Sequence, residues 1–195
     1  MHDTLSFVRQ AARRWRETGA VMPSTRRLAR KMSQAVGTLV PGQVIIELGP
    51  GTGVCTRELM TMFPANPVLA IEMNDHFAQS LRRDLPGVRV LQGCASHLAS
   101  LLREHGIAHE DVGAVVSGLP LLSLPRETTR AIIAAVIEIL PPGRPFVQFT
   151  YSTRAFSRLD LSGLDPQPGR RVWMNLPPAT VIPFTRNGPI PAPSP

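Results

Sequence analysis

Short apolar runs alternate with amphipathic stretches along most of the chain. The runs that predict buried strands are too short for helices and are bounded by turn residues; they cover 44–48, 68–71, 88–91, 112–116 and 146–151. The stretches that predict helices carry apolar residues at helical spacing; they cover 25–36, 52–62, 74–84, 97–104 and 126–140. Strands that alternate with helices predict an α/β fold with a mostly parallel sheet and right-handed crossovers.

The C-terminal part of the chain has a different pattern. Turn residues with little periodicity fill 152–169, and two short apolar runs, 171–174 and 180–184, then predict an antiparallel hairpin on the sheet edge. We therefore expect a main domain over 37–186, preceded by helical residues 1–36. Residues 187–195 are rich in proline and lack packing side chains, which predicts a disordered tail.

The N-terminal segment predicts a basic amphipathic helix over Leu5–Glu17. Its apolar face carries Trp15, and Arg9, Arg13 and Arg16 flank that face. Such a helix can lie in the headgroup layer of an anionic membrane, although the same face can also simply pack on the domain. Ser24 is then the expected N-cap of a second helix, on which Arg26 and Arg27 face outward and join the candidate lipid contacts.

Composition narrows the possible classes. A chain of 195 residues with 43% hydrophobic content is long enough for one sizeable core. No apolar stretch reaches the roughly 18 residues of a membrane span, and arginines interrupt any N-terminal signal pattern. Cys55 and Cys94 form no disulfide framework, which fits a reducing cytoplasm. The net charge of +7 points to an anionic partner, either nucleic acid or an acidic membrane surface.

The candidate chemistry is concentrated after the first strand. The sequence Val44–Gly53 reads V-I-I-E-L-G-P-G-T-G, in which alternate glycines allow positive φ and a close approach of a ligand to the backbone. The first free N–H groups of the next helix point into this turn. Glu72 ends the second strand about 20 residues beyond the turn, where a carboxylate can bind both hydroxyls of a ribose. Three glycines in an ordinary loop and a solvated Glu at a strand end are the alternatives.

The spacing G-x-G-x-G resembles motif I of the class I S-adenosylmethionine-dependent methyltransferases. This resemblance implies that the turn packs against the methionine part of the cofactor and that Glu47 faces its ammonium group. That family usually has an acidic residue for the adenine after the third strand, where this chain has Cys94. The expected cofactor-binding residues are Glu47, Gly49, Pro50, Gly51, Thr52, Gly53, Glu72, Met73, Gly93, Cys94, Ala95 and Ser117.

Further segments resemble the soluble bacterial phospholipid N-methyltransferases, over roughly residues 19–186. They are A-V-M-P-S-T-R-R-L-A-R-K-M at 20–32, V-V-S-G-L-P-L-L-S-L-P at 115–125, F-V-Q-F-T-Y at 146–151 and N-L-P-P-A at 175–179. The resemblance implies stepwise methylation of phosphatidylethanolamine toward phosphatidylcholine by a cytoplasmic protein held peripherally on the inner face of the plasma membrane. It implies S-adenosylmethionine as the cofactor and neither a metal nor nucleic acid as a partner.

The expected reaction centre is the carboxyl end of the fourth strand, because ligands of open α/β sheets sit at that edge. The candidate catalytic residues are Ser117, Gly118, Leu119 and Pro120, with Tyr151 at the end of the fifth strand. Tyr151 can place its ring against a methylated cation or accept a hydrogen bond from the amine; its alternative role is edge-strand packing. None of these residues is an obvious base, so we expect the amine to enter neutral.

Two other functions stay open. The related rRNA adenine dimethyltransferases share motif I, but they carry Asn-Leu-Pro-Tyr after the fourth strand, where this chain has Gly118-Leu119-Pro120-Leu121 without an aromatic residue to stack on a flipped base. In an RNA methyltransferase the basic N-terminal segment would be a phosphate track. A basic adaptor that has lost activity is the third possibility, and Cys94 is its only indication.

Overall fold

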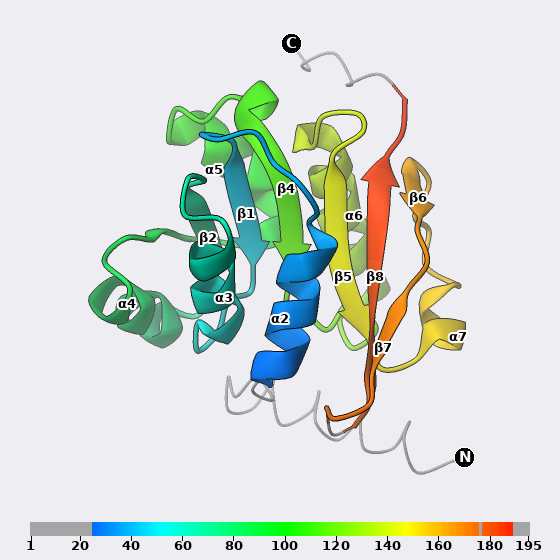
Figure 1. Ribbon diagram of the computed structural model, residues 1–195. Helices are drawn as coiled ribbons and strands as arrows, with labels where there is room; N and C mark the ends of the chain where they lie inside the picture. Colours follow the sequence, from blue (N-terminus) through cyan, green and yellow to red (C-terminus); the bar gives the residue numbers. More distant parts are fainter. Residues whose placement is uncertain (1–24, 176, 189–195) are drawn as a thin grey trace.

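The computed structural model describes residues 25–175 and 177–188, which form one sheet with helices on both faces (Figure 1). The strands are β1 (Val44–Leu48), β2 (Val68–Glu72), β3 (Arg89–Gln92), β4 (Val112–Ser117), β5 (Pro145–Thr150), β6 (Leu164–Pro166), β7 (Arg170–Val172) and β8 (Ala179–Arg186). The helices are α2 (Arg26–Ala35), α3 (Val54–Met62), α4 (Asp75–Asp84), α5 (Leu98–Glu104), α6 (Arg126–Ile139) and α7 (Thr153–Phe156), with 3₁₀ turns η1 (Ala95–His97) and η2 (His109–Asp111).

Strands β1 to β5 are parallel, as the alternating pattern predicts. The strand order is β3–β2–β1–β4–β5–β8–β6, so β1 pairs with β2 on one side and with β4 on the other. The chain thus leaves β1 toward one half of the sheet and returns to β4 in the other half. The connections that follow β1 and β4 run to opposite halves of the sheet, so a switch point lies between these two strands, and open α/β sheets bind ligands at such a point.

The C-terminal strands extend the sheet beyond β5. Strand β8 runs antiparallel to β5, with Phe146 opposite Phe184, and the antiparallel β7–β8 pair of the predicted hairpin is confirmed by the partners Val172 and Ala179. However, β8 is an inner strand, because β6 and β7 pair with successive parts of its far edge. Residues 152–169, expected to be irregular, contain α7 and β6, which are too short to show a periodic pattern.

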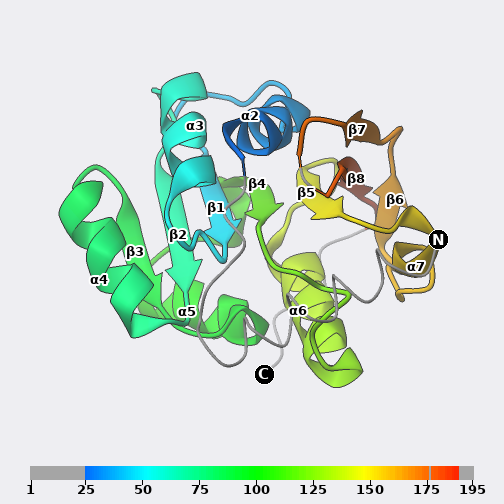
Figure 2. The same cartoon turned by 90° about the horizontal axis from the view of Figure 1, so that it is seen from below.

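Two apolar layers hold the helices on the sheet. Helices α2, α3 and α4 pack on one face through residues such as Leu28, Leu59 and Leu81, and α5 and α6 pack on the other through Leu98 and Val136. Figure 2 shows these layers from the end at which the parallel strands terminate. Helix α2, expected in the helical segment that precedes the domain, is therefore part of the core packing.

Helix ends differ from the sequence expectations where side chains or glycines cap them. The N-cap of α2 is Thr25 and the expectation of Ser24 is wrong, because Thr25 is extended and its side chain accepts from the Leu28 N–H. Helix α3 starts at Val54 and not at Thr52, because Gly53 at φ 77° belongs to the loop. Helix α4 starts at Asp75 because Asn74 caps it. Ser24 itself, the helix expected over Leu5–Glu17 and the tail beyond Gly188 lie outside the described residues.

Candidate active site

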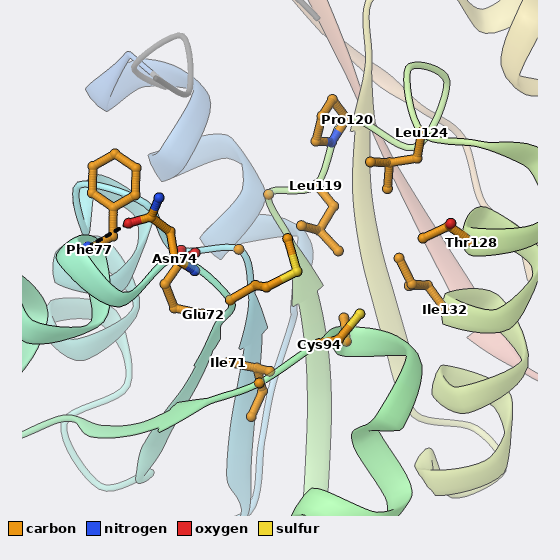
Figure 3. A pocket seen from close by; sticks show the side chains of 15 residues that line it. Ile71, Glu72, Asn74, Phe77, Cys94, Leu119, Pro120, Leu124, Thr128 and Ile132 are labelled. Carbon is orange, nitrogen blue, oxygen red and sulfur yellow. Dashed lines mark hydrogen bonds between the residues drawn. The ribbon is translucent and has the colours of Figure 1, made fainter. Parts of the chain in front are cut away.

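A pocket of about 430 Å³ opens at the carboxyl ends of β1, β2, β3 and β4 (Figure 3). Nine of the expected site residues line it: Gly49, Glu72, Met73, Gly93, Cys94, Ala95, Gly118, Leu119 and Pro120. Ile71, Asn74, Phe77, Leu124, Thr128 and Ile132 complete the lining. Glu72 and Asn74 lie on one side of the pocket, and Leu124, Thr128 and Ile132 lie on the other.

The glycines after β1 and β4 bring two loops into direct contact. A Cβ on Gly49, which has φ 67°, would lie 2.5 Å from Leu119 Cδ2, and a Cβ on Gly118 would lie 2.7 Å from the Gly49 carbonyl oxygen. The Gly118 N–H also donates to Leu48 O at 2.8 Å. A side chain at position 118 would meet backbone atoms, and one at position 49 would need a positive φ as well as a shift of the Leu119 side chain, so glycine is favoured at both positions.

Glu72 connects the second strand to the glycine-rich loop. Its Oε2 accepts a hydrogen bond from the Gly51 N–H at 3.0 Å, and its Oε1 accepts one from the Asn74 N–H at 2.8 Å. A carboxylate oxygen has two acceptor positions, so each Glu72 oxygen keeps one for a further donor. The residue therefore fits a diol such as the two hydroxyls of a ribose, and this observation favours a nucleoside ligand.

Glu47 is not among the residues that line the pocket. Its side chain is 1% exposed, and its Oε2 has no hydrogen-bond partner among the described residues. Burial raises the pKa of Glu47 to about 7, and the Thr56 and Cys55 side chains lower it in part. The Thr56 hydroxyl likewise has no hydrogen-bond partner among the described residues, so neither Thr56 nor Cys55 forms a hydrogen bond to Glu47 Oε2. The contact of Glu47 with an ammonium group stays a prediction.

The loop after β4 is held by a side chain that the sequence did not indicate. Gln148, fully buried on β5, donates from Nε2 to the carbonyl oxygen of Leu119 at 2.9 Å and to that of Phe149 at 2.8 Å. Ser117 is buried and is not among the residues that line the pocket; its Oγ accepts from the Leu119 N–H at 3.3 Å. The Gln148 and Ser117 side chains therefore both hold the backbone of Leu119 in position.

The far end of the pocket contains the residues expected to meet an adenine. Cys94 is half-buried and lies 3.0 Å from Ser96 through Sγ and Oγ, immediately before η1. Met73, which is 63% exposed, and Phe77 on α4 also line the pocket. The adenine contact expected at Cys94 stays a prediction.

Tyr151 lies at the end of β5, outside the pocket lining. Its ring packs edge-to-face on Phe149 at 5.4 Å between centroids, and burial raises the pKa of its hydroxyl, which the Asn175 side chain offsets in part. Asn175 is buried; its Oδ1 accepts from the Thr25 hydroxyl at 2.9 Å, and its Nδ2 donates to Pro177 O at 2.8 Å. The N-cap of α2 is thereby joined to the β7–β8 turn beside Tyr151.

The remaining expected site residues frame the pocket or lie elsewhere. Pro50, Gly51, Thr52 and Gly53 form the loop behind Gly49 that leads into α3. Arg26 and Arg27 are exposed on α2, whereas Arg9, Arg13, Trp15 and Arg16 lie outside the described residues. Within the described ranges, no three His, Cys, Asp or Glu side chains are grouped to hold a metal ion.

Comparison with known proteins identifies the family. Residues 29–92, which include the glycine-rich loop and Glu72, match a family model described as ribosomal RNA adenine dimethylase. The chain is 32% identical over 141 residues to an ornithine lipid N-methyltransferase from Singulisphaera acidiphila, across 70% of this chain and 72% of that protein.

Solved structures agree on the fold. The crystal structure of TrmN from Thermus thermophilus has a TM-score of 0.65 at 20% identity, across 82% of this chain and 48% of that one, so this chain spans about half its length. A TehB-like methyltransferase from Corynebacterium glutamicum has a TM-score of 0.62 at 17% identity, across 94% of this chain and 100% of that one. These likenesses confirm the predicted methyltransferase architecture.

The pocket, the Glu72 carboxylate that can bind a ribose diol, and the related proteins all fit S-adenosylmethionine. The expectation of this compound as the methyl donor is confirmed. The chain belongs to the class I S-adenosylmethionine-dependent methyltransferases, in the family that includes the Singulisphaera lipid N-methyltransferase.

Proposed function

We propose that this protein transfers methyl groups from S-adenosylmethionine to the primary amine of phosphatidylethanolamine, and then to its mono- and dimethyl derivatives, toward phosphatidylcholine. The observation that carries the proposal is the apolar lining of the pocket at the carboxyl end of β4, where we expect methyl transfer. Gly118, Leu119 and Pro120 present an apolar surface there, next to Gly49. The name of the Singulisphaera relative, a lipid amine methyltransferase, supports the same substrate class.

Methyl transfer requires the side chains mainly to position the amine and to exclude water. When bound, S-adenosylmethionine supplies a methyl group on a sulfonium, and an in-line displacement needs the acceptor at near-attack distance in a site without water. Leu119 and Pro120 can exclude water from that position, and Gln148 and Ser117 hold the Leu119 backbone in place. These residues would therefore serve by positioning.

The amine must lose a proton before it can accept a methyl group, and the pocket offers no clear base for this step. Among the residues that line the pocket, Glu72 and Cys94 are the ionisable ones, and both Glu72 oxygens already accept backbone hydrogen bonds. Neither lies in the Gly118–Pro120 segment. An amine that enters neutral needs no base before transfer, and the proton of the product amine is then released to water. We expect the rate to rise with pH until the amine is largely deprotonated.

An RNA substrate is the second candidate because of the family model that matches. That match ends at residue 92, so it covers the cofactor half of the fold and stops before the loop after β4. In that loop, Gly118-Leu119-Pro120-Leu121 has no aromatic side chain for a flipped adenine. A lipid amine needs no stacking partner, which favours the lipid over the base.

The protein would meet its lipid as a peripheral protein on the inner face of the plasma membrane. In the described part of the chain, no helix has both the length and the apolar character to cross a bilayer. Helix α2 turns Arg26, Arg27, Arg30 and Lys31 outward, and each basic residue near an anionic membrane contributes about 1 kcal/mol of attraction.

The deciding experiment is a transfer assay with labelled methyl donor and three acceptors offered separately. These are phosphatidylethanolamine vesicles, ornithine lipid vesicles and ribosomal RNA. We expect label in the phosphatidylethanolamine products, separated by chromatography, and strongly reduced labelling after Glu72→Ala when the methyl donor is kept below saturation. Label on ornithine lipid alone would keep the lipid class and change the head group. Label on RNA and on neither lipid would refute the proposal.

A further inference from the structure

Two neighbouring apolar side chains are exposed without a role in the pocket. The large hydrophobic residues that are exposed in the described ranges are Val40, Met73, Trp173 and Met174, at 60%, 63%, 71% and 69%. Met73 borders the pocket, where a bound cofactor would cover it. Trp173 and Met174 stand together in the turn after β7. Their exposure calls for a partner.

The turn lies at the same end of the molecule as the pocket. Figures 1 and 2 show β7 and the turn that follows it beside the start of α2, at the end where β1, β4 and β5 terminate. Two contacts fix it there: Arg27 donates to Met174 Sδ, and Thr25 donates to Asn175 Oδ1 at 2.9 Å. Trp173 and Met174 therefore have a defined orientation relative to the site.

Positive charge surrounds this pair. The guanidinium carbon of Arg171 lies 4.5 Å from the centroid of the Trp173 ring, a cation–π contact that keeps the ring beside a charge. Arg26, Arg27, Arg30 and Lys31 are exposed on α2 nearby. Neither 26–36 nor 170–186 contains an acidic residue. The surface thus presents an apolar centre within a basic border.

A bilayer fits such a surface better than another protein does. A stable protein interface covers about 800 Å² on each partner, whereas a tryptophan and a methionine together supply a few hundred Å². At a membrane, an amphipathic ring settles at the headgroup level while arginines bind anionic headgroups around it. The pattern of charge and apolar area is complementary to an anionic phospholipid layer.

We propose that Arg171, Trp173 and Met174, with Arg26 and Arg27 beside them, form an interfacial anchor that inserts into the headgroup layer of an anionic bilayer. We call these five residues the β7 anchor. It would turn the carboxyl edge of the sheet, and with it the pocket mouth, toward the lipid amines. This inference rests on the lipid substrate of the proposed function. It is independent of residues 1–18, since it uses a different part of the chain.

Vesicle binding of the full-length protein tests the anchor directly. Vesicles of phosphatidylcholine with phosphatidylglycerol are sedimented with the native protein, with the double variant Trp173→Ser, Met174→Ser, and with Val40→Ser. Val40 is the matched control because it is comparably exposed in the turn before β1. We expect about a tenfold or greater loss of vesicle binding in the double variant and no change in the control. Unchanged thermal stability and S-adenosylmethionine affinity would show that the double variant is folded.

Tryptophan fluorescence gives a second readout, which reports on the Trp173 ring itself. The chain has two tryptophans, so Trp15→Phe leaves Trp173 as the only tryptophan. Vesicles that contain brominated phosphatidylcholine should quench this emission, and vesicles without bromine should not. If the variant sediments with vesicles while Trp173 is not quenched, the anchor is refuted. Equal binding of the native and double-variant proteins would refute it as well.

Two further measurements separate the possible failures. If the double variant loses affinity for a ribosomal RNA fragment but not for vesicles, this surface binds RNA and the anchor is wrong. Native activity on short-chain phosphatidylethanolamine monomers reports the proposed function without any bilayer. Activity on monomers combined with equal vesicle binding of both proteins would overturn the anchor alone, whereas no lipid activity in any form would overturn the proposed function.

Discussion

Glu72 accepts a hydrogen bond from the Gly51 N–H at 3.0 Å, and so the residue expected to bind the ribose also fixes the loop expected to hold the methionine part of the cofactor. The other Glu72 oxygen accepts from Asn74 at 2.8 Å, which is the N-cap of α4. One buried carboxylate thus links β2, the glycine-rich loop and the start of α4. Loss of this carboxylate should disturb both halves of the cofactor site.

Glu72→Ala should weaken S-adenosylmethionine binding by about 10- to 100-fold, because hydrogen bonds to a charged group contribute about 1.5–3 kcal/mol. Cys94→Ala should change the affinity much less, since a thiol is a weak donor and Cys94 already lies 3.0 Å from Ser96. Isothermal titration calorimetry of both variants measures the difference. Equal dissociation constants would contradict the roles assigned to these two residues.

Gly118→Ala should reduce both cofactor affinity and stability. The added Cβ would lie 2.7 Å from Gly49 O, a backbone atom that can move only with its loop, and such overpacking costs about 1–3 kcal/mol. Gly87→Ala is the control, because its Cβ would meet only the flexible end of Met60, at 3.2 Å. Denaturant unfolding and calorimetry measure the two effects. If both alanine variants behave alike, the contact between the two loops is not tight.

The stability of the cofactor-free protein should depend on pH through Glu47. Its pKa is about 7 in the folded protein against 4.5 as the ordinary value, so the folded state holds the proton more tightly than the unfolded state does. The resulting destabilisation is absent below pH 4.5, grows as pH rises and is complete above pH 7. The shift corresponds to up to about 3 kcal/mol for this fully buried group.

Glu47→Gln removes that dependence. The variant should melt at a higher temperature than the native protein at pH 8 and at nearly the same temperature at pH 5, as measured by calorimetry without cofactor. A melting difference of the same size at both pH values would show that Glu47 does not carry the buried charge.

Tyr151→Phe and Tyr151→Ala separate the two roles predicted for this residue in the proposed reaction. If the ring binds a methylated cation, a contact of about 0.5–2 kcal/mol, Phe should keep the KM for dimethylated lipid and Ala should raise it by about 2- to 30-fold. If the hydroxyl is used, both variants should lose activity equally. Unaltered kinetics in Tyr151→Ala would leave packing on Phe149, at 5.4 Å between ring centroids, as its function.

Deletion of residues 1–18 should weaken binding to anionic vesicles while the cofactor affinity stays within a few-fold. The cofactor site is built from the ends of β1 to β4, whereas the deleted segment carries Trp15 and four arginines, each worth about 1 kcal/mol near such a surface. High salt should imitate part of the effect through screening. A truncated protein that keeps its vesicle affinity, or that also loses cofactor binding, would show that this segment packs on the domain.

The amino-acid sequence by itself determined the cofactor half of the protein. The apolar run of β1, the positive-φ glycines after it and the acidic end of β2 are local features, and each follows from the chain within about 30 residues. Local sequence restricts local backbone conformation, and parallel strands necessarily bring their carboxyl ends to one edge. For this reason nine of the expected site residues line one pocket.

Only the tertiary structure decided how the loop after β4 and the C-terminal strands are held. The Thr25–Asn175 hydrogen bond joins residues 150 positions apart, and the Gln148–Leu119 bond joins two separate strand ends. The insertion of β8 between β5 and the short strands β6 and β7 likewise depends on packing against Phe146 and Phe156, not on any pattern within β8. Contacts between distant segments gain free energy only when the whole core is assembled, so no local pattern in the chain encodes them.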